Sequence, residues 1–146
     1  MPTAESAKKL EFSSQVAGEI RAFSRSLGLD DWDIRVGDPD RFDYDLCEEG
    51  YIIRQDDERV ATLYVHPEAD AWQIERIVVH ELLHVVLADL EFIASNGATV
   101  ETMELYARFQ ERAISVLVGA ITGNTIWQPV EACQKLNHAP GHNLDS

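Results

Sequence analysis

Two histidines and a glutamate occur in the sequence at a spacing that suits metal chemistry, in the stretch His80-Glu81-Leu82-Leu83-His84. Residues four positions apart lie one turn apart on the same face of an α-helix, so both imidazoles could reach one metal ion. Zinc binds imidazole nitrogen readily, and it lowers the pKa of a bound water toward ~7. Glu81 would lie to the side of that face, where its carboxylate could take the proton of the water as the water attacks a carbonyl.

The segment around this motif predicts a buried helix. We expect the helix to run from about Ala71 to Leu90, with Asp70 as its cap and Gln73 in capping-box position. Its centre is apolar on nearly every side, which is typical of a buried helix. Such a helix has little reason to carry two histidines and a glutamate unless something satisfies them. This context favours a metal site over polar residues that neighbouring side chains satisfy or that lie on an exposed stripe.

A zinc site that keeps a position open for water needs a third protein ligand. The next predicted helix, from about residue 100 to 120, offers three glutamates, Glu101, Glu104 and Glu111. If the two helices form an antiparallel hairpin that turns near residues 95–96, the level between the histidines faces about residue 109. Along the helix axis Glu111 then lies roughly 3 Å from that level and Glu104 roughly 7.5 Å from it. We therefore expect Glu111 as the third ligand, with Glu104 or the strand-end His66 as alternatives.

The rest of the sequence predicts the helices and strands that would position these residues. Apolar spacing indicates a first helix over 5–27, and alternation indicates strands over 32–36, 51–54 and 60–65, the last two forming a hairpin. The order predicts the α+β class, with a small antiparallel or mixed β-sheet packed against helices. The helix with the histidines is followed by the helix with the third ligand. We expect one domain over 1–128 and an irregular tail over 129–146.

Composition narrows the partners and the compartment. The chain has 12 Lys and Arg against 26 Asp and Glu, a net charge of −14, which disfavours binding to nucleic acid. It has no apolar run of the ~18 residues that a membrane span needs, and its start lacks the layout of a secretory signal. We expect a cytoplasmic protein with no membrane partner. Cys47 and Cys133 form no CxxC pair, which predicts two separate thiols rather than a disulfide.

The stretch 79–87 resembles the active helix of minimal zincins and is most similar to small HExxH metallopeptidases common in phages and prophages. The stretch 109–117 is similar to the glutamate-bearing helix that follows in that group. The resemblance implies that His80, His84 and Glu111 are the zinc ligands and that Glu81 is the catalytic base. It also implies that the strand before the active helix, over 61–65, binds a peptide along its edge through main-chain hydrogen bonds. A plain core strand is the alternative.

A hydrolase of this kind also needs a group that stabilises the oxyanion of the transition state. The sequence offers four candidates for this role or for substrate contact, Tyr64, His66, Tyr106 and Arg108, and does not choose among them.

Two functional hypotheses follow. In the first, the chain is a zinc-dependent metallopeptidase in which Glu81 activates a zinc-bound water toward the carbonyl of a peptide or protein substrate. In the second, it is a non-catalytic, zinc-stabilised binding module whose acidic surface engages a basic partner protein. A hydrolase that acts on a non-protein amide is a third alternative. The sequence sets neither the substrate nor the oligomeric state.

Overall fold

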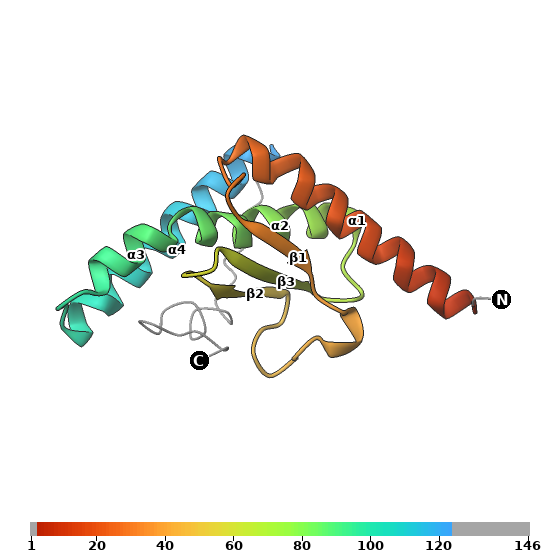
Figure 1. Cartoon of the computed structure of the whole chain (residues 1–146), viewed down its shortest axis with the longest axis horizontal. Coiled ribbons are helices and arrows are strands. Elements are labelled where there is room, and N and C mark those ends of the chain that lie inside the picture. Colours follow the sequence, from red (N-terminus) through yellow and green to blue (C-terminus); the bar gives the residue numbers. More distant parts are fainter. Residues whose placement is uncertain (1–2, 124–146) are drawn as a thin grey trace.

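A computed structural model of the chain describes residues 3–123 (Figure 1). The predicted tail over 129–146 lies outside the described residues. Along the described part the elements are α1 (Ala4–Ser26), β1 (Asp33–Val36), the short 3-10 helix η1 (Pro39–Arg41), β2 (Gly50–Gln55), β3 (Val60–Val65), α2 (Ala71–Val86), α3 (Ala88–Ser95) and α4 (Val100–Thr122). The α+β class is thereby confirmed. None of the described helices is both long and apolar enough to cross a membrane.

The three strands form one mixed sheet in the order β1-β3-β2. β1 runs parallel to β3, and β2 runs antiparallel to it with Ile52 opposite Leu63. The prediction that residues 61–65 form a substrate-binding edge is wrong, because β3 is hydrogen-bonded to a strand on each side. The alternative, a core strand, is what the structure contains. Within the described residues the two edges of the sheet belong to β1 and β2.

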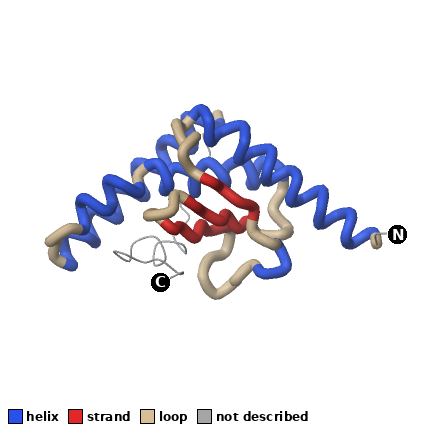
Figure 2. The backbone as a smooth tube through the Cα atoms, in the orientation of Figure 1, coloured by secondary structure: helices blue, strands red, loops and turns tan. Residues whose placement is uncertain are grey.

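Helices α1 and α2 lie on one face of the sheet (Figure 2). The inward side chains of β3, Ala61, Leu63 and Val65, pack there with Val16 and Ile20 of α1 and with apolar residues of α2. Alternate side chains of a strand point to opposite faces, so Tyr64 points the other way. It stacks on Tyr51 with ring centroids 4.8 Å apart, in a cluster that includes Phe42 and Cys47. The sheet therefore separates the helical core from a smaller aromatic cluster.

Cys47 belongs to that smaller cluster. It is buried and disulfide-bonded, so the prediction of a separate thiol is wrong for this residue. The sequence spacing could not reveal this, because a disulfide requires only that two cysteines meet in space. Cys133 lies outside the described residues.

The capping box predicted for α2 is present, with the Gln73 side chain accepting a hydrogen bond of 2.8 Å from the Asp70 backbone N–H. Every residue from Arg76 to Val85 is buried, as the apolar pattern predicts. The predicted single helix from Ala71 to Leu90 is in fact two helices. Leu87, with φ −91° and ψ 4°, lies between them, outside the usual helical region of backbone conformation.

Candidate metal centre

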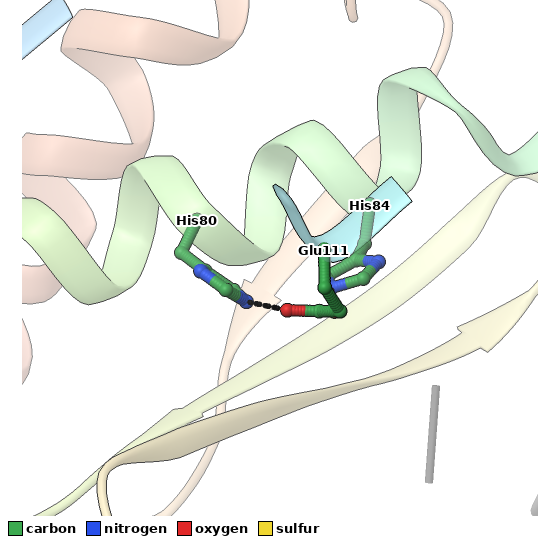
Figure 3. A group of neighbouring side chains, drawn as sticks. All are labelled: His80, His84 and Glu111. Carbon is green, nitrogen blue, oxygen red and sulfur yellow. Dashed lines mark ion pairs between the residues drawn. The ribbon is translucent and has the colours of Figure 1, made fainter. Parts of the chain in front are cut away.

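His80, His84 and Glu111 meet in the interior, between α2 and α4 (Figure 3). Each offers one ligand atom, and these atoms all lie within 4.8 Å of one another. The Nε2 atom of His84 is 2.7 Å from Oε1 of Glu111, and Nε2 of His80 is 3.5 Å from Oε2 of the same carboxylate. All three side chains are buried. They lie close enough together to hold a metal ion.

Apolar packing between α2 and α4 brings Glu111 to the histidines. Val79 and Leu83 of α2 form one cluster with Ile114 and Val118 of α4. Val79 and Leu83 each immediately precede one residue of the motif, and Ile114 follows Glu111 by three positions, so the cluster lies beside the polar group. Glu111 therefore lies beside the two histidines, as the predicted pairing of the two helices led us to expect.

The alternative third ligands lie elsewhere. Glu101 and Glu104 are exposed on α4. His66, at the end of β3, packs its ring edge-on against Phe42 and Tyr44, with ring centroids 5.5 and 5.4 Å away. Its Nδ1 accepts a hydrogen bond from the backbone N–H of Glu68 at 3.0 Å. None of the three belongs to the ligand group.

The four candidates for oxyanion or substrate contact are also dispersed. Tyr64 faces away from the helices, His66 packs against Phe42 and Tyr44, and Arg108 is exposed on α4. Tyr106 differs, because its hydroxyl is buried and makes no hydrogen bond to the described residues. Burial and the nearby Glu91 carboxylate raise the pKa of Tyr106. Of the four, Tyr106 is the one that places a polar atom in the interior on the helical side of the sheet.

The electrostatics of the site favour a bound cation. Burial, with His84 and Arg76 nearby, lowers the pKa of His80 from 6.5 to about 3, so its imidazole is neutral and ready to ligate. Glu81 is 1% exposed, and burial together with the Glu111 charge raises its pKa well above the ordinary value. Two carboxylates in one buried space repel each other, and a divalent cation would relieve that repulsion.

Hydrogen bonding at the site gives the same indication. Nε2 of His80 and Oε2 of Glu81 are buried and make no hydrogen bond to any described residue. Leaving one such group unsatisfied costs about 1–3 kcal/mol, which a metal ligated by His80 would offset. The donor set of imidazole nitrogens and a carboxylate therefore fits a zinc ion.

Two arginines beside the site were not anticipated from the sequence. Arg76 precedes His80 by one helical turn and is buried, with its guanidinium 2.9 Å from the carboxylate of Glu49. The sequence feature that could have pointed to Arg76 is that it is a single basic residue within an apolar helix, on the same face as the histidines. Arg54 of β2 donates a hydrogen bond of 3.1 Å to the backbone carbonyl of His84. No local pattern marks the contacts of Arg54 with His84 and Glu91, because these residues lie 30 and 37 positions further along the chain.

No family model matches the chain, and the searches of curated proteins and of solved structures found no match either. The resemblance to minimal zincins thus stays a prediction.

Proposed function

We propose that this chain is a zinc-dependent hydrolase that cleaves peptide bonds. The convergence of His80, His84 and Glu111 within 4.8 Å, with Glu81 beside them on α2, carries the proposal. Two histidines and one acidic residue form a ligand set that is used by catalytic zinc and leaves a coordination position for water. A purely structural zinc site more often has four protein ligands.

In this proposal Glu81 acts as the general base. Its Oε1 lies 4.0 Å from Nε2 of His80, beside the ligand atoms but outside the group that they form. Bound zinc would supply a Lewis acid that lowers the pKa of a water ligand and polarises a carbonyl oxygen. The positive charge would also favour the ionised form of Glu81, which a base requires. Tyr106, whose buried hydroxyl makes no hydrogen bond to the described residues, would donate a hydrogen bond to a developing oxyanion in this proposal.

The substrate would be an extended peptide that adds to β2. Among the described strands β2 pairs with β3 alone, so its other side is an edge of the sheet. It is also the strand that contacts the end of α2, through Arg54 and the carbonyl of His84. A peptide hydrogen-bonded along β2 would therefore run near the proposed ligands. In this proposal β2 takes the place first expected of residues 61–65.

The burial of the site favours the second hypothesis, a zinc-stabilised module without catalysis. His80, His84 and Glu111 are 3%, 0% and 6% exposed, which leaves a substrate little access in this conformation. A zinc ion there would act mainly as a link between α2 and α4, and the net charge of −14 would suit a basic partner protein.

Substitution of Glu81 separates the two hypotheses. We expect Glu81→Gln to retain zinc and thermal stability but to lose cleavage of a proteome-derived peptide library, followed by mass spectrometry. His80→Ala should lose both zinc and cleavage. Glu104→Gln, which changes an exposed glutamate of α4, is the matched control and should behave as the unaltered chain. Cleavage that survives Glu81→Gln, or a purified chain that binds no zinc, would overturn the proposal.

A further inference from the structure

The side chain of Arg54 connects three elements at the end of the helix that carries His84. Its Nη1 donates to the backbone carbonyl of His84 at 3.1 Å, and its Nη2 lies 3.3 Å from Oε2 of Glu91 on α3. Its Nε lies 3.2 Å from Oδ1 of Asp56. The side chains of Arg54 and Glu91 are 14% and 9% exposed. A buried ion pair with this many contacts holds its partners in one arrangement more strongly than an exposed pair does.

The carbonyl that Arg54 contacts lies at the end of the helix. α2 ends at Val86, so the carbonyl of His84 belongs to its last turn. The chain turns at Leu87 and continues as α3, which supplies Glu91. The single side chain of Arg54 thereby contacts the end of α2 and the first turn of α3, and it connects both to the sheet through β2.

The same ion pair reaches toward α4. Burial raises the pKa of Glu91, and Arg54 opposes that rise, with a smaller contribution from Gln110, the buried neighbour of Glu111 on α4. The pair touches α2 directly, through the carbonyl of His84.

We propose that Arg54, held by Glu91, is a positioning residue for the metal centre. Through the carbonyl of His84 it fixes the last turn of α2, and with it the imidazole of His84, relative to Glu111 on α4. The inference rests on the proposed function only in requiring that zinc binds at these ligands. Outer partners of metal ligands orient the ligands, and their loss typically weakens metal binding about 10–100-fold.

Arg59 is a matched control on the same β-hairpin. Its Nη2 lies 3.2 Å from Oδ2 of Asp89, so it too joins the hairpin to α3 by an ion pair. Its side chain is 39% exposed, and its contacts with Asp31, Asp89 and Trp32 involve no proposed metal ligand. Arg59→Met therefore removes a comparable connection between the hairpin and α3 without disturbing the carbonyl of His84.

The test measures zinc affinity by competition with a chromophoric chelator, and the absorption spectrum of the cobalt-substituted chain. Arg54→Met should weaken zinc binding about 10–100-fold and alter the cobalt spectrum. Arg54→Lys, which retains a cation and a donor, should recover part of that loss. Arg59→Met should change the affinity by less than about threefold, although it can lower thermal stability.

Equal zinc affinity and an unchanged cobalt spectrum in Arg54→Met would overturn the inference. If that variant does not fold, Glu91→Gln replaces it, and unchanged zinc affinity in Glu91→Gln overturns the inference in the same way. A weaker affinity supports it. Failure of the unaltered chain to bind zinc is a different result, since it would overturn the proposed function itself.

Discussion

Nε2 of His84 lies 2.7 Å from Oε1 of Glu111, across the contact between α2 and α4. The two residues come from different helices, and α3 lies between those helices in the chain. Their approach depends on the apolar cluster of Val79, Leu83, Ile114 and Val118, which packs α2 against α4. The candidate site is thus a consequence of helix packing, and both the ligands and the packing behind them can be tested.

Replacement of Glu111 should remove most of the zinc affinity. We expect Glu111→Gln to weaken zinc binding by more than the roughly 10–100-fold loss that an outer partner causes, because a ligand itself is lost. Zinc at 100 times its Kd should stabilise the unaltered chain by about 2.7 kcal/mol and should leave Glu111→Gln nearly unaffected at the same concentration. Thermal unfolding with and without zinc measures the difference, and Glu104→Gln serves as the control. Equal stabilisation of both variants would exclude Glu111 as a ligand.

Removal of apolar volume behind the site should affect stability and zinc together. Ile114 is 0% exposed, and we expect Ile114→Ala to lower the free energy of unfolding by about 2–4 kcal/mol. Because Ile114 lies one turn after Glu111, zinc affinity should fall as well. Val116→Ala, at a position that is 67% exposed, should change the free energy by less than about 0.5 kcal/mol. Urea denaturation and zinc competition provide the two measurements. An Ile114→Ala chain as stable as Val116→Ala would show that this packing is unimportant.

The stability of the metal-free chain should depend on the protonation of His80. The pKa of His80 is about 3 in the folded chain against 6.5 ordinarily, so below pH 6.5 the unfolded chain binds a proton that the folded chain does not. The contribution of His80 to stability is therefore present above pH 6.5 and is lost as the pH falls toward 3. Between pH 6.5 and 4.5 this loss amounts to about 2 kcal/mol.

The protonation of Glu81 makes the stability of the metal-free chain change with pH in the opposite direction. Its pKa is raised, so the folded chain retains a proton that the unfolded chain releases, and stability falls as the pH rises above 4.5. The two effects are separated by comparing the unaltered chain with His80→Gln in chelator, by denaturation at pH 6.5 and 4.5. His80→Gln should lose about 2 kcal/mol less than the unaltered chain over that interval. Parallel pH profiles for His80→Gln and the unaltered chain would contradict the prediction.

The sequence alone determined the parts of the site that depend on local periodicity. The helical repeat places His80 and His84 on one face, and the cap at Asp70 with Gln73 starts the helix before them. Glu111 was also within reach of sequence reasoning, because an antiparallel pairing of the histidine helix with the next long helix limits the residues that can face the histidines.

Tertiary structure decided the rest. Strand order is set by which strands pair, so β3 proved to be central and Tyr64 to face away from the helices, although both strands of the hairpin were predicted. The contact of Arg54 with the carbonyl of His84 spans 30 residues and has no local signature. Helix periodicity is a property of neighbouring residues, whereas strand order and the partner of a buried charge depend on how the whole chain packs.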